Sequence, residues 1–406
     1  MKRPYLSRTL EPVLAQAAKD FPAVVLTGPR QSGKTTLLKR LFGTTHRYVS
    51  LELPDVQAAA LSDPRGFLAL HPSPVIFDEI QYCPDLLAYI KEAIDAHRSR
   101  KGQYLLTGSQ NLLLLESVTE SLAGRAAILR LLPLSFRELS GDPDARLPWE
   151  GHRGKRSAHV SLIFLWQQLL RGNYPELAVE PQREFRLWHG SYAQTYIERD
   201  VRLVRQIGDL AIFQNFLKTL AARSGQLLNL SDISRDLGAA VNTLKIWLSV
   251  LEASYQVVVL RPYHVNIGKR LVKTPKVYFT DTGTLCYLAG LKEADHAASG
   301  PLAGPIFETA ILSEILKTLN HRGEEPEVYF WRTFTGGEVD FIVRWKGKLI
   351  PVEAKLSATP LPAMAKGIIA FQKDLGKKAD DGFVIHPGES HLPLAPRVTG
   401  MPFAQW

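Results

Sequence analysis

The chain has 406 residues, 45% of them apolar, which predicts a globular protein of about three domains, each able to bury a core. Its two cysteines are too few for a disulfide framework or a cysteine-rich zinc site, and its 11 histidines show no HxxxH or HExxH spacing, so we expect no transition metal. The formal net charge of +9 is a mild argument for a polyanionic partner.

The sequence also argues against a membrane partner. Its first residues, MKRPYLSRTLEP, carry charges and prolines instead of a secretory apolar region. No apolar run approaches the roughly 20 residues needed to cross a bilayer. We therefore expect a cytoplasmic location.

A phosphate-binding loop follows the first strand-like run. AVVLT leads directly into GPRQSGKT, which matches GxxxxGK[ST] in the context this motif requires. Backbone N–H groups of such a turn surround a phosphate, Lys34 reaches the terminal phosphates, and Thr35 offers its hydroxyl to Mg²⁺. Gly28 and Gly33 supply the backbone freedom. The predicted nucleotide-binding residues here are Gly28, Pro29, Arg30, Gln31, Ser32, Gly33, Lys34, Thr35 and Thr36.

Two further strand ends complete the predicted nucleotide site. The run VIFDEIQ ends in Asp78, which would hold Mg²⁺ through water, and Glu79, which would orient or deprotonate the attacking water. A third strand, QYLLTGSQN, ends in Thr107, Ser109 and Gln110, polar groups placed to read the state of the terminal phosphate.

These three elements resemble the AAA+ ATPases, and Asp78 followed at once by Glu79 matches their second nucleotide motif. Further segments, SLAGRAAILRLLPLSFREL, RGNYPEL, YAQTYIERDVR and YFTDTGTLCYLAG, resemble the prokaryotic AAA+ family that ends in a domain of unknown function (family 4143) with a PD-(D/E)XK nuclease-like fold. The resemblance covers nearly the whole chain. It implies ATP as the nucleotide and Ser109 or Gln110 as the sensor.

The same resemblance makes Arg125 the candidate for an arginine that acts catalytically on a neighbouring subunit's nucleotide, which would require a homo-oligomer formed through the AAA+ core. Arg130 and Arg137 compete for this role. The alternative is a helix-capping or salt-bridging surface arginine.

A polar stretch, GDPDARLPWEGHRGKRSAH at 141–159, predicts the end of the ATPase core, which we place at residues 1–145. The helical pattern beyond it predicts a lid at residues 159–222.

Residues 223–282 are predicted to form a winged helix-turn-helix. LSDISRDLG predicts a helix capped by Ser231 and stopped by Gly238, NTLKIWLSVLEASY a second helix, and QVVVL with KVYFT a hairpin. The predicted DNA-contacting start of the second helix comprises Asn242, Thr243 and Lys245. The hairpin segment contains basic residues and no acidic one, which suits phosphate contacts: Arg261, Lys269, Arg270, Lys273 and Lys276. A protein–protein spacer with a solvated basic hairpin is the alternative.

The last predicted domain, residues 283–406, carries a second set of chemical groups. GPIFETAILSEILKTL is a predicted helix, and EVDFIVRWKGKLIPVEAKLS predicts two strands joined by the turn WKGK. This segment resembles the PD-(D/E)XK nuclease core, and the resemblance places Glu308, Asp340, Glu353 and Lys355 at its helix acid, strand acid and E-x-K positions. There Glu308, Asp340 and Glu353 would hold Mg²⁺, while Asp340, Glu353 and Lys355 would act on a phosphodiester. Glu314 is an alternative to Glu308, on a different face of the helix.

Two other interpretations of this domain stay open. One is a surface hairpin with common acidic and basic residues. The other is a nuclease-like fold kept for DNA binding without cleavage.

The predicted fold class is therefore an α/β multidomain protein. It has a P-loop AAA+ parallel-sheet core with a helical lid, a winged helix-turn-helix and a C-terminal PD-(D/E)XK nuclease-like α/β domain. The predicted function is ATP-dependent DNA processing, with branched or junction DNA suggested only by analogy of fold. The alternatives are a non-catalytic, ATP-dependent DNA-binding switch and a signalling or defence ATPase.

Overall fold

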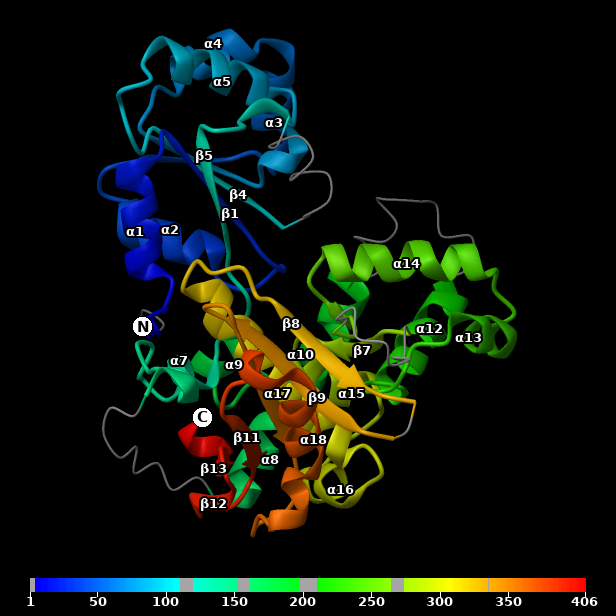
Figure 1. The fold of residues 1–406 in the computed structure, drawn as a ribbon. Coiled ribbons are helices and arrows are strands. Elements are labelled where there is room, and N and C mark those ends of the chain that lie inside the picture. The colour runs from blue at the N-terminus through cyan, green and yellow to red at the C-terminus, as the bar shows by residue number, and fades with distance from the viewer. Residues whose placement is uncertain (1–3, 110–119, 152–160, 198–209, 264–273, 335) are drawn as a thin grey trace.

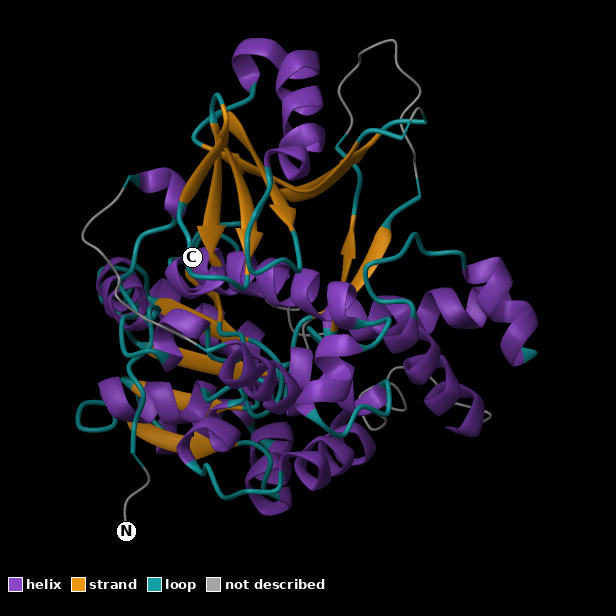
Figure 2. Cartoon of the chain, turned by 90° about the horizontal axis from the view of Figure 1, so that it is seen from below, coloured by secondary structure: helices purple, strands orange, loops and turns teal. Residues whose placement is uncertain are grey.

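The computed structural model describes residues 4–109, 120–151, 161–197, 210–263, 274–334 and 336–406. Figure 1 shows the N-terminal part of the chain, in blue and cyan, above the C-terminal part, in yellow to red. A group of helices, in green, lies to one side. Figure 2 shows the strands of the two larger sheets as separate groups with helices around them.

The N-terminal sheet is entirely parallel, with strand order β2-β3-β4-β1-β5. Every residue of β1, β3 and β4 is buried, as expected for strands covered by helices on both faces. The strands are β1 (Ala23–Thr27), β2 (Arg47–Ser50), β3 (Val75–Asp78), β4 (Tyr104–Gly108) and β5 (Ala126–Arg130). The helices are α1 (Glu11–Asp20), α2 (Lys34–Phe42), α3 (Pro54–Ser62), α4 (Pro64–Leu70), α5 (Leu86–Ala96) and, after β5, α7 (Phe136–Leu139).

Two apolar clusters cover the two faces of this sheet. Side chains of α1 and α2 pack on one face, and side chains of α3, α4 and α5 pack on the other. All carboxyl ends of parallel strands lie at one edge of a sheet, so the loops after β1, β3 and β4 meet there. This arrangement confirms the predicted P-loop ATPase core.

The middle of the chain is mainly helical. Its helices are α8 (Leu162–Arg171), α9 (Pro175–Val179), α10 (Phe185–Tyr192), the π-helical turn Ala193–Ile197, α12 (Leu210–Ala222), α13 (Leu230–Leu237), α14 (Val241–Ala253), α15 (Thr282–Leu288) and α16 (Ala294–Ser299). Strands β6 (Val257–Leu260) and β7 (Lys276–Phe279) form an antiparallel pair between α14 and α15. The order helix, helix, hairpin agrees with the predicted elements.

One predicted cap is wrong. Helix α13 is capped by Asn229, whose side-chain oxygen accepts the N–H groups of Ser231 and Asp232, so Ser231 lies inside the first turn. Asparagine and serine are equally good caps, and the sequence pattern does not choose between two such residues placed two positions apart. The predicted stop is confirmed, because Gly238 adopts a left-handed conformation with φ 65°.

The C-terminal sheet is mixed, with order β12-β13-β11-β10-β9-β8. Strands β8, β9 and β10 form an antiparallel meander, β11 and β13 continue it in parallel, and β12 returns antiparallel to β13. The strands are β8 (Val328–Arg332), β9 (Glu338–Trp345), β10 (Lys348–Ala354), β11 (Gly382–His386), β12 (Leu392–Ala395) and β13 (Val398–Pro402). Its helices are α17 (Ala303–His321) and α18 (Lys366–Leu375).

A single apolar cluster runs from Leu147 through the middle helices and the β6–β7 hairpin to Trp406. The packing is therefore continuous across residues 222 and 282, where domain boundaries are predicted, and those boundaries stay a prediction. A separate cluster joins α18 to the other face of the C-terminal sheet.

Helix α17 contacts β10 of the C-terminal sheet and β5 of the N-terminal sheet. Its Glu314 accepts a hydrogen bond of 2.7 Å from the Phe136 N–H and forms an ion pair of 2.8 Å with Arg137, both at the start of α7. Each side chain of this ion pair is 1% exposed. A paired charge at this depth holds the two domains together, because separating them would leave each charge without its partner.

We expect Glu314→Ala to lower the free energy of unfolding by about 3 to 5 kcal/mol, because Arg137 would stay buried without a counter-charge. Urea unfolding followed by tryptophan fluorescence measures the loss. Glu327→Ala is the matched control, since it removes an ion pair with Arg344 whose side chains are about half exposed, and such pairs contribute little. Equal losses in the two variants would contradict a stabilising role of the buried pair.

Candidate functional site

The loop after β1 has the backbone that its glycines predict. Gly28 has φ 145° and Gly33 has φ 95°. A side chain at Gly28 would place its Cβ 2.1 Å from the Leu131 carbonyl oxygen, so only glycine fits there. Lys34 begins α2 and donates hydrogen bonds of 2.9 Å to the carbonyls of Gly28 and Pro29. The ammonium group therefore lies across the loop that would receive a phosphate.

Thr35 and Asp78 lie opposite each other at the end of β3. The Thr35 hydroxyl donates to both carboxylate oxygens of Asp78, at 2.9 and 3.0 Å. Tyr48 donates a further hydrogen bond of 2.7 Å to this carboxylate, and Thr107 also donates to it. Burial and the hydrogen bond to Asp78 raise the pKa of Tyr48, so it stays a neutral donor. A hydroxyl beside a carboxylate is a donor set that fits Mg²⁺.

Glu79 follows Asp78 in a left-handed conformation with φ 59°. Its carboxylate accepts a hydrogen bond of 3.0 Å from the Ser109 hydroxyl and another from the Gln81 amide. Burial alone would raise the pKa of Glu79, but the charges of Lys34 and Arg30 and these hydrogen bonds outweigh it, so the net pKa lies below its usual value. Glu79 is thus a carboxylate at neutral pH.

A cavity of about 580 Å³ is lined by Lys34, Thr35 and Glu79 of this set. Its wall also includes the N-terminal segment around Tyr5 and, from the helical region, Pro175 and Val179 of α9. Predicted nucleotide-binding residues that line it are Arg30, Gln31, Gly33, Lys34, Thr35 and Thr36, together with Glu79. Ser109 joins this set through Glu79, and Gln110 lies outside the described residues.

Three contacts from outside the loop reach its backbone or its first neighbour. Arg8 donates to the Ser32 carbonyl at 2.9 Å, and the Tyr192 hydroxyl donates to the Arg30 carbonyl at 3.4 Å. The hydroxyls of Thr27 and Tyr255 are 2.9 Å apart. No local sequence motif marks Arg8, Tyr192 or Tyr255, because these residues meet the loop only in the folded chain. Gln81 and Tyr48 were missed as well, although Gln81 follows Glu79 by only two positions.

The three candidate arginines have different surroundings. Arg125 forms a two-pronged pair with Asp95, with both N–O distances 2.8 Å, at the surface. Arg130 pairs with Glu325 at 3.0 Å. Arg137 is buried against Glu314 and cannot reach a neighbouring subunit, so it is wrong as a competitor. Arg125 has the geometry of the alternative interpretation, a salt-bridging surface arginine, and its action on another subunit stays a prediction.

The predicted DNA-contacting residues lie partly within the described structure. Asn242 and Lys245 are exposed at the start of α14, and Thr243 is half-buried. Three residues of the predicted wing lie outside the described residues: Lys269, Arg270 and Lys273.

One predicted wing residue is wrong. Lys276 is 4% exposed and forms an ion pair of 2.7 Å with Glu338 of β9, so its charge is directed into the protein.

In the C-terminal domain, the structure brings together the acids that the nuclease resemblance singles out. The Glu353 carboxylate pairs with Lys355 at 2.6 Å and accepts the Asp340 N–H at 3.3 Å. Asp340 accepts the Ala354 N–H at 2.9 Å. Glu308 accepts a hydrogen bond of 3.0 Å from the Tyr278 hydroxyl. We call Glu308, Asp340, Glu353, Lys355, Lys276 and Glu338 the C-terminal charge cluster.

The carboxylates of this cluster are protonated more readily than usual. Burial and the charge of Asp340 raise the pKa of Glu308 to about 7 and that of Glu353 to about 8. Burial also raises the pKa of Asp340, against the charges of Lys276 and Lys355. Repulsion between buried acids is relieved here by protons and by lysines.

The predicted three-carboxylate metal site does not fit this arrangement. Among the residues that the structure describes, no group of three or more His, Cys, Asp or Glu side chains is placed to hold a metal ion. Glu308, Asp340 and Glu353 accept their hydrogen bonds from protein donors instead. The alternative helix acid is wrong, because the Glu314 side chain of α17 faces α7 and forms an ion pair with Arg137 there.

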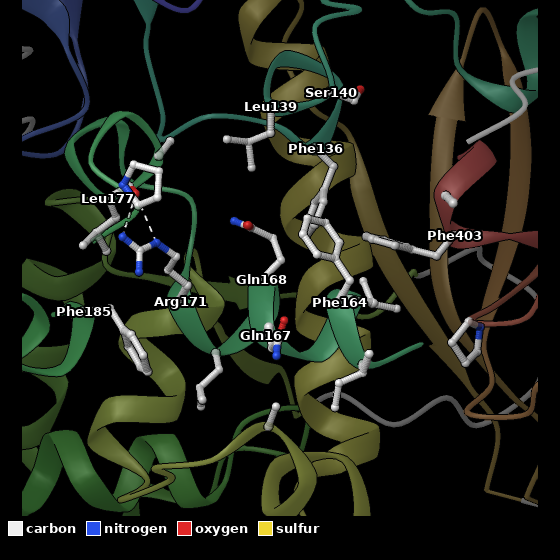
Figure 3. Close-up of a pocket in the computed structure, with 18 of the residues that line it drawn as sticks. Phe136, Leu139, Ser140, Phe164, Gln167, Gln168, Arg171, Leu177, Phe185 and Phe403 are labelled. Carbon is white, nitrogen blue, oxygen red and sulfur yellow. Dashed lines mark hydrogen bonds between the residues drawn. The ribbon is translucent and has the colours of Figure 1, made fainter. Parts of the chain in front are cut away.

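A second cavity, of about 1000 Å³, lies between α7, α8 and the end of the chain. Figure 3 shows Phe136, Phe164 and Phe403 on one side of it, and Arg171 donating to the Leu177 carbonyl on the other. Its lining is mainly apolar and includes none of the residues predicted to bind nucleotide, metal or DNA.

Within the described part of the chain, every helix is too short or too polar to span a lipid bilayer.

Comparison with known proteins assigns three segments. An AAA domain matches residues 20–140, a domain of unknown function (DUF8612) matches residues 164–295, and a domain of unknown function (DUF4143) matches residues 303–406. An uncharacterized protein of Mycobacterium tuberculosis is 29% identical over 394 residues, which are 97% of this chain and 82% of that protein. An uncharacterized protein of Haemophilus influenzae is 24% identical over 354 residues, 81% of each chain.

Two solved structures are distantly similar to this chain. The Walker-type ATPase of Pyrococcus abyssi shares 18% identity and a TM-score of 0.42, covering 71% of this chain and 99% of that chain. RuvB of Thermotoga maritima shares 17% identity and a TM-score of 0.27, covering 62% and 88%. The nucleotide loop and the acidic strand end lie within the AAA match, and α17 with the charge cluster's acids lies within the C-terminal match. The chain thus combines an AAA domain at residues 20–140 with the domain of unknown function 4143 at residues 303–406, which confirms these two parts of the expected resemblance.

Proposed function

We propose that this protein hydrolyses ATP and uses the nucleotide to control how it holds DNA, without cutting it. The observation that carries the first part is the set Lys34, Thr35, Asp78 and Glu79 at the carboxyl edge of a parallel sheet. Lys34 and Thr35 start the helix whose N-terminus attracts phosphate, and Asp78 and Glu79 supply the two carboxylates that hydrolysis needs.

The residues of the site would divide the work as follows. Thr35 and Asp78 would hold Mg²⁺, which supplies positive charge to the phosphates when bound. Lys34 would exchange its loop carbonyls for phosphate oxygens. Glu79, ionised at neutral pH, would orient the attacking water and accept its proton. Ser109 and Gln81 donate hydrogen bonds that hold the Glu79 carboxylate in place. For hydrolysis, these hydrogen bonds would have to rearrange when the terminal phosphate binds.

Contacts of the nucleotide loop support transmission of the nucleotide state. Tyr192, at the end of α10, contacts the Arg30 carbonyl, and Tyr255, at the end of α14, contacts Thr27. Gln256 next to it donates to the Tyr192 hydroxyl at 3.0 Å, which links the two tyrosines. A loop that moves with its phosphates would shift both helices.

The DNA part of the proposal is supported by charge and by the order of elements. The chain carries a net charge of +9, and α13, α14 and the β6–β7 hairpin follow the order of a winged helix-turn-helix. Asn242 and Lys245 are exposed at the start of α14, where base or phosphate contacts would be made. The rivals are a protein–protein spacer and a signalling or defence ATPase. Branched DNA as a substrate and an oligomer that uses Arg125 on a neighbouring subunit's nucleotide are further parts of the proposal.

For the C-terminal domain we propose a nuclease-like fold that grips DNA without cleaving it. This choice rests on the hydrogen bonds that occupy its carboxylates and on the lysines beside them. A metal-dependent nuclease needs carboxylate oxygens that face a cation instead.

We expect Glu79→Gln to lower the kcat for ATP at least about 100-fold while ATP still binds, because a neutral amide cannot accept the proton of the water. Phosphate release and binding of a fluorescent ATP analogue measure the two effects. Lys34→Ala should lose binding as well. Glu92→Gln, an exposed acid paired with Arg65, is the control. Full activity of Glu79→Gln, or no ATPase activity in the wild type with and without DNA, would overturn this part.

We expect the protein to retain labelled linear, forked and four-way DNA in Mg²⁺ and ATP and to leave it intact. Reversing charge by Lys269→Glu, Arg270→Glu and Lys273→Glu together should abolish retention, because phosphate contacts dominate affinity. Gel retardation at two salt concentrations measures binding, and denaturing gels measure cleavage.

Each DNA outcome decides one part of the proposal. Cleavage that Asp340→Ala abolishes would establish a nuclease in place of a grip. Retention unchanged by the triple charge reversal would remove the hairpin from the binding surface.

We expect the charge cluster to make stability depend on pH with a defined sign. The folded pKa values of Glu308 and Glu353, about 7 and about 8, lie above those of an unfolded chain, so the folded state binds more protons between about pH 4.5 and 8. Stability from this source is present at low pH and is lost as pH rises through that window. The melting temperature of the wild type should therefore fall relative to that of Glu308→Gln/Glu353→Gln between pH 5 and 8. Parallel curves would show that these acids titrate normally.

A further inference from the structure

We propose that Arg8 is a positioning residue of the nucleotide loop and that His321 of the C-terminal domain sets its position through Glu138. This inference rests on the proposed ATPase function. It makes the C-terminal domain a part of the nucleotide site, although none of its residues lines the nucleotide cavity.

Arg8 is held on three sides. It is 5% exposed and lines the nucleotide cavity. Its Nη1 donates to the Ser32 carbonyl at 2.9 Å, its Nη2 donates to the Leu132 carbonyl at 2.7 Å, and its Nε donates to the Glu138 carboxylate at 3.1 Å. A planar guanidinium that donates from Nη1, Nη2 and Nε has little freedom to rotate. Arg8 therefore fixes the loop relative to the strand end after β5.

The hydrogen bond to Ser32 has a consequence inside the loop. The peptide bond between Ser32 and Gly33 is trans, so its C=O and N–H point in opposite directions. Arg8 holds the carbonyl, which directs the Gly33 N–H away from the guanidinium. Phosphate-binding loops need their N–H groups turned inward. The hydrogen bond from Arg8 to Ser32 thus fixes the orientation of the Gly33 N–H before any nucleotide binds.

Glu138 connects Arg8 to the C-terminal domain. It is 1% exposed, and its Oε1 lies 3.1 Å from Arg8 Nε and 3.1 Å from His321 Nδ1. The same oxygen accepts the Thr9 N–H at 2.9 Å, and Oε2 accepts the Ser135 N–H at 2.9 Å. A carboxylate with these partners cannot move without leaving one of them buried and unsatisfied.

His321 ends α17 and is fully buried. Its Nε2 accepts the Leu132 N–H at 3.1 Å, so in the neutral ring the proton lies on Nδ1. Nδ1 lies 3.1 Å from Glu138 Oε1, a close polar contact that lacks the alignment of a hydrogen bond. Leu132 is consequently held from both sides, with its N–H on His321 and its carbonyl on Arg8. A displacement of α17 would be transmitted to Ser32 through the Glu138 carboxylate and the Arg8 guanidinium.

The experiment measures nucleotide binding and turnover in the full chain. We expect Arg8→Gln to raise the Kd for ADP with Mg²⁺ and the KM for ATP about tenfold, with kcat within about threefold, because a charge-assisted hydrogen bond that orders the loop is lost. His321→Phe, which keeps the ring's size, should raise both constants in the same direction. His321→Asn, which is smaller but keeps a polar N–H group towards Glu138, should restore them towards the wild type.

The matched control is His189→Phe. His189 is a second buried histidine. It is hydrogen-bonded to the Arg171 carbonyl, and within the described residues it makes no hydrogen bond or ion pair with the nucleotide loop. It should leave Kd and KM unchanged. Melting temperatures of all variants separate folding from positioning, since a packing role would make Asn, not Phe, the more damaging replacement.

Two results would overturn the relay. In the first, His321→Phe binds nucleotide as the wild type does. In the second, His321→Asn is no better than His321→Phe. A wild type that binds ADP but never hydrolyses ATP would contradict only the proposed function. The Kd values of the variants for ADP would still decide the role of His321.

Discussion

The buried junction between α7 and α17 is the constraint on which the rest of the structure depends. Glu138 and Glu314 are each 1% exposed, and an ionised carboxylate at that depth is stable only with charged partners and hydrogen bonds. The partners come from both ends of the chain. Glu138 takes Arg8 and His321, and Glu314 takes Arg137. The N-terminal core and the C-terminal domain are consequently fixed relative to each other by desolvated charge as well as by apolar contact.

The nucleotide loop is built within the same constraint. The carbonyls of Ser32 and Arg30 in the loop and the hydroxyl of its neighbour Thr27 are contacted by Arg8, Tyr192 and Tyr255, respectively, from different parts of the chain. A loop held from outside its own domain is suited to report its ligand, since a ligand can shift an equilibrium only through contacts that differ between states. In the proposed function, the chemistry at Glu79 and a shift of the two helices would be two uses of one loop.

Compensation of charge also governs the C-terminal cluster. Lys276 comes from the β6–β7 hairpin and Lys355 from the end of β10, and both lie among the acids. Acids with this spacing in the sequence suggest a metal site. Here, however, lysines, backbone N–H groups and protons already compensate the negative charge that a metal ion would otherwise neutralise. The same residues can thus have the sequence spacing of a nuclease core without assembling a metal site.

Much of the nucleotide site could be predicted from the sequence because its residues follow one another or end neighbouring strands. Gly28 to Thr35 form a local turn, and Asp78 and Glu79 end a strand, so short-range rules were enough. The wrong expectations concern long-range packing. Arg137 and Lys276 carry charge that the sequence places on a surface, and both turn inward to an acid distant in the chain.

The sequence by itself determined which chemical groups this protein can bring to a phosphate, since strand, glycine turn and helix are local structures set by nearby residues. Only the tertiary structure decided which charges are buried and what neutralises them. It separated Glu308 from Glu314 by pairing the latter with Arg137, and it joined Arg8 to His321 through Glu138. The physical reason is that the free energy of a buried charge depends on partners within a few ångström, and folding brings those partners together from distant positions in the chain.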